Sequence, residues 1–174
     1  VGTAVYNADV GAFYSKWLRE LMESQRPSGA FPGFAPFPFH RAWDFGTAWA
    51  DAGIICPWTV WQAYDDTRVI DRCWEPMSRF IEWRQRTSVD DLGIVHGNGW
   101  GDWLSQGEVT PLDYIDSVYF ALTTRMMSEM AEATGREAEA KAYRKQLART
   151  KAAFIKKYLN DDGSLKVKTQ TAYA

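Results

Sequence analysis

The sequence is poor in cysteine and histidine and contains no long hydrophobic run. Its two cysteines, Cys56 and Cys73, both fall within helix-like apolar stripes, which predicts two reduced thiols in the core rather than a disulfide framework. No spacing among these cysteines and the two histidines matches a metal site. No segment approaches the roughly 18 consecutive apolar residues of a membrane span, and Val1 does not begin a signal peptide, so we expect no membrane partner.

Charge of either sign is not in excess. Lys and Arg number 20 against 22 Asp and Glu, for a net charge of -2, so nothing favours a nucleic acid as partner. The length of 174 residues suits a single domain with a substantial core. The sequence indicates no cofactor, because the glycine run at 97–101 is not followed by the Gly-Lys-Ser/Thr of a phosphate-binding loop.

Tryptophan is abundant, with nine in 174 residues, and most of them lie in or beside loops or helix ends. The rest of the pattern predicts an all-α fold, because apolar residues recur at the three-four spacing of amphipathic helices. The predicted helices cover residues 4–24, 52–64, 70–86, 112–133 and 136–159, with the first turn of another at 169–174.

Local signals set the expected helix ends. Pro57 limits the start of the second helix and Pro76 should kink or break the third, because a proline deep in a helix costs about 3 kcal/mol. Thr110 followed by Pro111 predicts a helix start with Thr110 as its cap. Gly135 predicts the end of that helix.

The first of two long connections, residues 27–49, is rich in proline and aromatic residues. Disordered linkers are poor in aromatics, so we expect an ordered, packed loop over the mouth of a site. Long and short connections roughly alternate along the chain, which in an assembly of helical hairpins sends the long loops to one end. No repeat of about 34 residues is present, which weighs against a tetratricopeptide-type solenoid.

The second long connection contains the stretch from His96 to Leu104, which reads His-Gly-Asn-Gly-Trp-Gly-Asp-Trp-Leu. Glycines let a backbone approach a ligand, the indoles of Trp100 and Trp103 offer flat apolar faces, and the Asp102 carboxylate accepts hydrogen bonds from hydroxyls. This combination suits a sugar, which has an apolar ring face and a rim of hydroxyls. The alternative is a turn between two helices with both tryptophans buried.

Two aspartates accompany these tryptophans. Asp51 follows Trp49 closely, and Asp102 directly precedes Trp103. We expect both carboxylates to be partly exposed in one cavity with Trp49 and Trp103. From the residues alone they would form an acid and base pair, since a tryptophan-lined loop raises a carboxylate pKa. Asp51 has a simpler alternative role as a helix N-cap.

A series of short motifs runs in order along the whole chain. They are Tyr6-Asn7-Ala8-Asp9 with Trp17-Leu18-Arg19, Ala48-Trp49-Ala50-Asp51-Ala52-Gly53 with Pro57-Trp58, Gly99-Trp100-Gly101-Asp102-Trp103-Leu104, Thr110-Pro111 with Tyr119-Phe120-Ala121, and Thr169-Gln170-Thr171-Ala172-Tyr173-Ala174. The ordered set resembles the catalytic domain of bacterial α-L-rhamnosidases, glycoside hydrolase family 78.

The resemblance implies an (α/α)₆ barrel of six helical hairpins that hydrolyses terminal α-L-rhamnosides with inversion. It places Trp49 and Trp103 against the rhamnose, with Asp51 and Asp102 beside them and Trp100 as a weaker candidate. The acid and base glutamates of the family have no counterpart in the sequence. We therefore assign no catalytic residue and expect residues 1–174 to be part of a single barrel domain truncated at both ends. Its partners would be a rhamnose-containing glycoside and the remainder of the same enzyme.

Two other classes of protein would share much of this pattern. Another α/α-barrel glycosidase or a polysaccharide lyase would contain a similar sugar cup. A non-catalytic helical scaffold would carry its tryptophans in the core.

We expect residues 1–174 expressed alone to show no hydrolysis of an aryl α-L-rhamnoside, because the two catalytic carboxylates that the resemblance implies lie outside them. Release of the chromogenic aglycone measures this directly. Turnover that disappears in an Asp102→Asn variant would contradict the expectation and make Asp102 a catalyst.

Overall fold

The computed structural model describes residues 1–37, 46–88, 90–95 and 99–174. These residues form helices, and an isolated antiparallel bridge pairs Leu159 with Leu165. The helices are α1 (Ala4–Asn7), α2 (Gly11–Glu23), α3 (Ala52–Tyr64), α4 (Arg68–Thr87), α5 (Leu112–Ala133), α6 (Glu137–Tyr158) and α7 (Gln170–Tyr173). Within these ranges, no helix combines the length and the apolar character that crossing a membrane requires.

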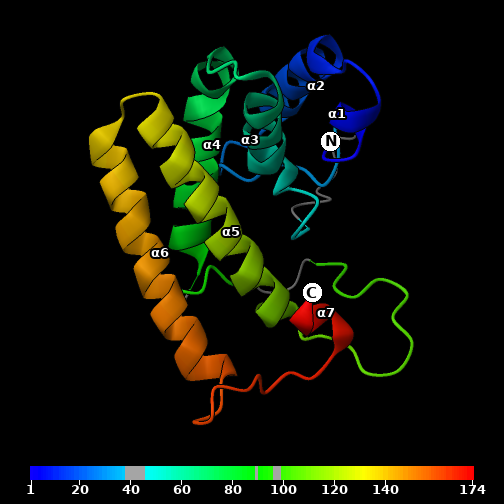
Figure 1. Cartoon of the computed structure of the whole chain (residues 1–174), viewed down its shortest axis with the longest axis vertical. Helices are drawn as coiled ribbons and strands as arrows, with labels where there is room; N and C mark the ends of the chain where they lie inside the picture. Colours follow the sequence, from blue (N-terminus) through cyan, green and yellow to red (C-terminus); the bar gives the residue numbers. More distant parts are fainter. Residues whose placement is uncertain (38–45, 89, 96–98) are drawn as a thin grey trace.

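The long helices pair as hairpins (Figure 1). Short turns join α3 to α4 and α5 to α6, and α2 packs against α3 and α4. Gly135 follows α5 with φ +72°, a left-handed conformation open to glycine, and the N–H of Arg136 donates to the Ala131 carbonyl at 2.8 Å. The predicted helix end at Gly135 is thus confirmed.

The main core lies where α2, α3, α4 and α5 meet. Its fully buried members include Phe31, Ile54, Met77, Phe80 and Met127. A smaller apolar cluster joins the segment after α4 to α5 and α6, and consists of Leu92, Ile94, Tyr114 and Tyr158. Both cysteines are free and buried, as the sequence predicts.

Both internal prolines lie inside their helices. α3 covers Ala52–Tyr64, the predicted range, with Pro57 in its second turn, and α4 continues through Pro76 without a break. Pro57 leaves the Gly53 carbonyl without its helical donor, but Gly53 packs so tightly on the buried Phe31 that a Cβ there would lie 2.3 Å from the ring. Burial in the core outweighs the local penalty of a proline.

The expected start and cap of two helices also differ. The predicted helix at 4–24 is divided into α1 and α2, because the N–H of Val10 donates to the Tyr64 hydroxyl at 2.8 Å and so ties the break to the end of α3. Thr110 does not cap α5, which begins at Leu112 without a side-chain cap. The Thr110 hydroxyl bonds instead to Asp102 at 2.6 Å.

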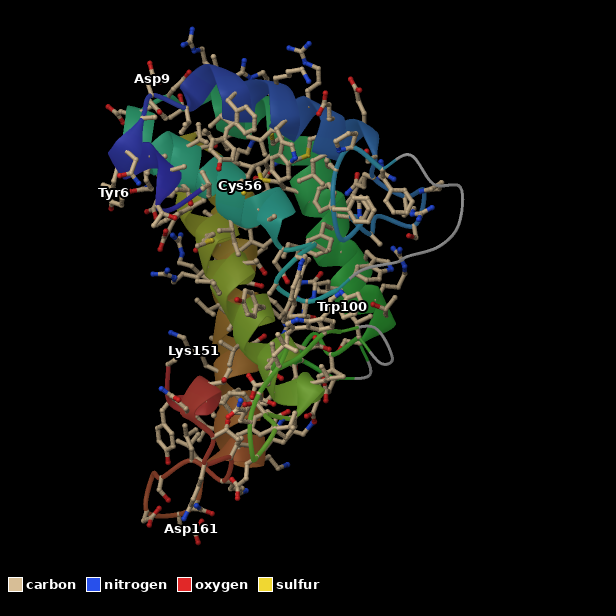
Figure 2. All side chains as sticks on the ribbon, turned by 90° about the vertical axis from the view of Figure 1, so that its right-hand side faces the viewer. Tyr6, Asp9, Cys56, Trp100, Lys151 and Asp161 are labelled. Atoms are coloured by element: carbon tan, nitrogen blue, oxygen red, sulfur yellow. The ribbon has the colours of Figure 1, made fainter. Side chains whose placement is uncertain are left out.

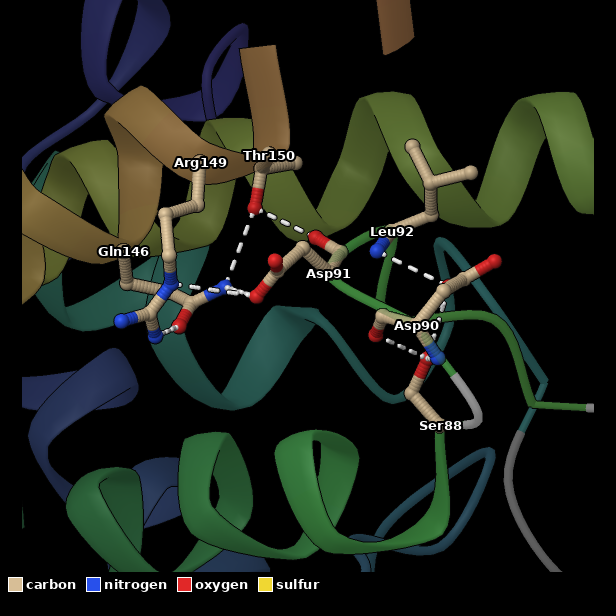
Figure 3. Close-up of polar contacts among 7 residues, drawn as sticks. All are labelled: Ser88, Asp90, Asp91, Leu92, Gln146, Arg149 and Thr150. Atoms are coloured by element: carbon tan, nitrogen blue, oxygen red, sulfur yellow. Dashed lines mark hydrogen bonds and ion pairs between the residues drawn. The ribbon is translucent and has the colours of Figure 1, made fainter. Parts of the chain in front are cut away.

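The segment after α4 is anchored to α6 by a polar cluster (Figure 3). The Asp91 carboxylate accepts from the Arg149 guanidinium at 3.1 Å, and the Thr150 hydroxyl donates to the Asp91 carbonyl at 2.7 Å.

The short turns lie at the upper end of Figure 1, and the long connections lie away from that end. The predicted gathering of the long loops at one end is confirmed, since Trp49 and Trp100 contact each other.

We expect Gly53→Ala to destabilise the protein by roughly 1–3 kcal/mol, because its new methyl group would overlap the Phe31 ring in a close-packed core. Thermal unfolding of the full-length protein measures the change. Gly33→Ala is the matched control, since a Cβ at Gly33 has no atom within 4 Å. Equal melting temperatures for the two variants would contradict the packing argument.

Candidate functional site

Three indoles from the two long loops form one cluster. The ring centroids of Trp49 and Trp100 lie 6.4 Å apart, and those of Trp100 and Trp103 lie 4.9 Å apart at 76°. The tryptophans remain 44%, 46% and 60% exposed, respectively. In Figure 2, Trp100 lies where the two loops approach each other. The cluster therefore offers aromatic surface to solvent, and a scaffold with buried tryptophans does not fit it.

Glycine allows the close approach of these loops to their surroundings. Gly101 has φ +56°, and a Cβ there would lie 2.8 Å from the Leu112 side chain. A Cβ at Gly46 would lie 3.2 Å from the Trp100 ring. The backbone between Trp100 and Trp103 thus takes a turn that a larger residue would strain.

Asp51 is fully buried, so the expectation that it is partly exposed beside the tryptophans is wrong. Its Oδ1 accepts from the Arg84 guanidinium at 2.9 Å, and its Oδ2 accepts from the N–H of Ala48 at 2.9 Å. Burial raises the pKa of the Asp51 carboxyl, while Arg84 and the Ala48 N–H act in the opposite direction. Nor does its side chain cap α3, although Asp51 occupies the N-cap position. Its carboxylate instead connects the loop of Trp49 to α4, through the bonds from Ala48 and Arg84.

Asp102 is partly exposed and closes its own loop. Its Oδ2 accepts from the Thr110 N–H at 2.9 Å and from the Thr110 hydroxyl at 2.6 Å. Hydrogen bonds from the hydroxyls of Thr110 and Thr171 lower the pKa of this carboxyl. Asp102 is therefore a carboxylate at neutral pH, suited to accept a hydrogen bond and unsuited to donate a proton.

A cavity of about 420 Å³ opens beside Trp49. It is apolar, and its lining is Trp17, Leu21, Pro32, Gly33, Phe34, Ala35, Ala48, Trp49 and Ala52. Of the four residues that we expected to share one cavity, this cavity contains only Trp49. Trp103, Asp51 and Asp102 are not part of its lining. Among the residues that the structure describes, no cluster of three or more His, Cys, Asp or Glu side chains could hold a metal ion.

Parts of both predicted loops lie outside the described residues, among them His96 and Trp43. In the described part of the first loop, Phe31 is fully buried in the core, and Phe34 and Phe37 contact each other with ring centroids 5.1 Å apart. The predicted packing of this loop is confirmed for these residues.

Sequence reasoning missed Arg84 and Asp116, which are 0% and 4% exposed. Arg84 donates to Asp51 and to the carbonyls of Gly93 and Asp116, each at 2.9 Å. A signal was present: Arg84 continues the apolar stripe of α4 at helical spacing from Phe80, and Asp116 lies four residues before the buried Phe120 on α5. A charged residue within a buried stripe requires a partner.

Packed helical hairpins whose long loops meet at one end are the features of a domain of the α/α-barrel class. The chain belongs to the family of the bacterial alpha-L-rhamnosidase 6 hairpin glycosidase domain, whose model matches residues 1–174. The predictions of family and of an all-α fold from a six-hairpin barrel are confirmed.

Relatives agree with this assignment. The chain is 33% identical over 171 residues to an alpha-L-rhamnosidase of Streptomyces avermitilis, covering 98% of this chain and 16% of that protein. It is 27% identical to an alpha-L-rhamnosidase of Formosa agariphila, covering 98% of this chain and 19% of the relative. The chain therefore spans less than a fifth of the length of these relatives.

Solved structures show the same fold. The Streptomyces avermitilis alpha-L-rhamnosidase complexed with L-rhamnose matches 95% of this chain and 16% of its own, with a TM-score of 0.86 and 32% identity. The alpha-L-rhamnosidase from Dictyoglumus thermophilum matches 88% of this chain and 17% of its own, with a TM-score of 0.79 and 28% identity.

The lowered pKa of Asp102 predicts a pH dependence of its loop. The folded pKa lies below the unfolded value of about 3.9, so the stabilisation is fully present above pH 4 or so and is lost as the pH falls through the folded pKa. We expect the hydrogen-exchange protection factor of the Thr110 amide to follow this course and Asp102→Asn to remove this pH dependence, because an amide does not titrate.

Asp162→Asn is the matched control, because Asp162 also accepts from a nearby backbone amide, that of Ser164 at 2.9 Å, in a separate turn. Its substitution should leave the Thr110 protection factor unchanged. A Thr110 protection factor with the same pH dependence in Asp102→Asn as in the wild type would show that the carboxylate does not close the loop.

Proposed function

We propose that this chain is part of an α-L-rhamnosidase catalytic domain and that its tryptophan cluster holds the terminal L-rhamnose. The observation that carries the proposal is the contact of Trp49, Trp100 and Trp103 across two loops, with 44–60% of each side chain exposed. The family and the L-rhamnose complex of the Streptomyces avermitilis relative support the choice of sugar.

The chemistry of the sugar fits the cluster. L-Rhamnose carries a methyl group where most hexoses carry a hydroxymethyl, so its ring and methyl present apolar C–H surface that packs on an indole face. Trp103 is the most exposed of the three tryptophans, at 60%. Asp102, on the same loop, is a partly exposed carboxylate that accepts a hydrogen bond from a sugar hydroxyl.

The bond-breaking carboxylates belong elsewhere in this proposal. An inverting hydrolase needs an acid and a base about 6.5–9.5 Å apart with a water between them. Asp51 is buried against Arg84, and Asp102 is held as a carboxylate by Thr110, so these two do not form that pair. Residues 1–174 then form one part of a single barrel domain, and the acid and base glutamates come from the remainder of the enzyme.

Asp51, which the sequence placed beside the sugar, has a supporting role in this proposal. Its carboxylate reaches Arg84 and Ala48 rather than solvent, so it supports the loop of Trp49 instead of contacting the sugar. The contacting residues are Trp49, Trp100, Asp102 and Trp103.

We expect Trp103→Ala in the complete enzyme to lower kcat/KM for an aryl α-L-rhamnoside on the order of tenfold, because the variant loses an aromatic contact that also orients the ring. Steady-state kinetics measure the loss, and Trp103→Phe should recover part of it. Phe13→Ala is the matched control, since Phe13 is 62% exposed on α2, outside the cluster. Unchanged kcat and KM in a folded Trp103→Ala enzyme would refute the assignment.

A further inference from the structure

A buried polar network lies directly behind the tryptophan cluster and connects both of its loops. At its centre is Arg84 of α4, which is 0% exposed. Its guanidinium donates to the Asp51 carboxylate, the Gly93 carbonyl and the Asp116 carbonyl, each at 2.9 Å. Asp51 ends the loop of Trp49, Gly93 belongs to the segment that leads to Trp100, and Asp116 lies on α5. One side chain thus binds three separate parts of the chain.

The Asp116 carboxylate makes a second connection between the same loops. Its Oδ1 accepts from the Thr47 hydroxyl in the first loop, and its Oδ2 accepts from the Val95 N–H in the second at 3.0 Å. Thr47 is 4% exposed, as is Asp116. Each carboxylate oxygen therefore fixes one of the loops that carry the indoles.

The backbone directly before Trp49 is also constrained. Ala48 has φ +75°, a left-handed conformation that residues other than glycine rarely adopt. The Asp51 Oδ2 accepts from the N–H of Ala48 at 2.9 Å and holds it in that conformation. The direction in which the Trp49 side chain leaves the loop follows from the bonds of Thr47 and Ala48.

Helix packing alone does not require such a network. Buried ion pairs lose hydration, and apolar side chains of similar volume often stabilise a protein as well or better. What the network does supply is a fixed relative position of two loops, since Arg84 and Asp116 each bind groups from both of them.

We propose that four side chains, those of Arg84, Asp116, Asp51 and Thr47, are positioning residues. They set the separation between the Trp49 and Trp100 indoles to the value that the bound sugar requires. The part of this proposal that concerns the sugar rests on the proposed function. The part that concerns the indoles rests on the hydrogen bonds alone.

The test substitutes Thr47 in the complete enzyme, of which residues 1–174 are part, labelled with 5-fluorotryptophan. Thr47→Val keeps the shape of the side chain but removes the hydroxyl that Asp116 accepts from. We expect the ¹⁹F resonance of Trp49, assigned by its loss in Trp49→Phe, to shift or broaden. We expect KM for an aryl α-L-rhamnoside to rise about three- to tenfold with a smaller change in kcat, and Thr47→Ser to restore both values.

Thr123→Val is the matched control. Thr123 is a fully buried threonine on α5 whose hydroxyl donates only within its helix, to the Tyr119 carbonyl at 2.8 Å and the Phe120 carbonyl at 3.3 Å. Its substitution removes a buried hydroxyl of the same kind but should leave the Trp49 resonance and KM unchanged. If Thr47→Val does not fold, Asp116→Asn replaces it, because an amide keeps one acceptor oxygen but presents an N–H₂ to the second loop.

The outcomes separate the two proposals. A complete wild-type enzyme that does not hydrolyse the rhamnoside overturns the proposed function, and the ¹⁹F resonance still decides whether the network positions Trp49. A Trp49 resonance and KM that stay at wild-type values in Thr47→Val overturn the positioning role. Equal changes in Thr47→Val and Thr123→Val also overturn it, because they would reflect general destabilisation.

Discussion

The burial of one guanidinium group governs how the loops of this domain meet. A charge removed from water destabilises a fold by several kcal/mol unless hydrogen bonds and an opposite charge compensate for it. Arg84 obtains that compensation from the Asp51 carboxylate and from the carbonyls of Gly93 and Asp116. These acceptors lie on different segments, so the arginine is satisfied only when the first loop, the second loop and α5 are all in place. The arrangement of the indole cluster follows from that condition.

The helices were predictable because their signals are local. Apolar spacing located α5 and α6 closely, and Gly135 marked the end of α5, since both features depend on neighbours within a few residues. The errors at Thr110 and at the break between α1 and α2 have the opposite cause. The Thr110 hydroxyl donates to Asp102 instead of capping α5, and the Val10 N–H donates to Tyr64 of α3, so contacts outside the helix itself outweigh the local preference.

The sequence predicted the aromatic part of the candidate site but not the burial of Asp51. A tryptophan beside glycine or in a long loop indicates an exposed aromatic surface, and Trp49, Trp100 and Trp103 do form one. The burial of Asp51 was not predictable from its neighbours in sequence. The cation that pairs with its buried carboxylate is Arg84 of α4, 33 residues away along the chain. The charged positions within the apolar stripes of α4 and α5 were the available signal for this partner.

The aspartates near the indoles show how this part of the molecule divides its functions. Asp51 binds Arg84, Asp116 binds Thr47 and Val95, and Asp102 binds Thr110, so all three carboxylates accept hydrogen bonds from the loops or from the helix behind them. A catalytic acid must instead be free to exchange its proton with the substrate at the working pH, which needs a raised pKa and access to the reacting atoms. Asp102 has the reverse, a lowered pKa, and Asp51 has no access to solvent. Near the described indoles, then, these three carboxylates fix the loops while the indoles stay partly exposed, and neither Asp51 nor Asp102 combines the solvent access and the raised pKa that a catalytic acid needs.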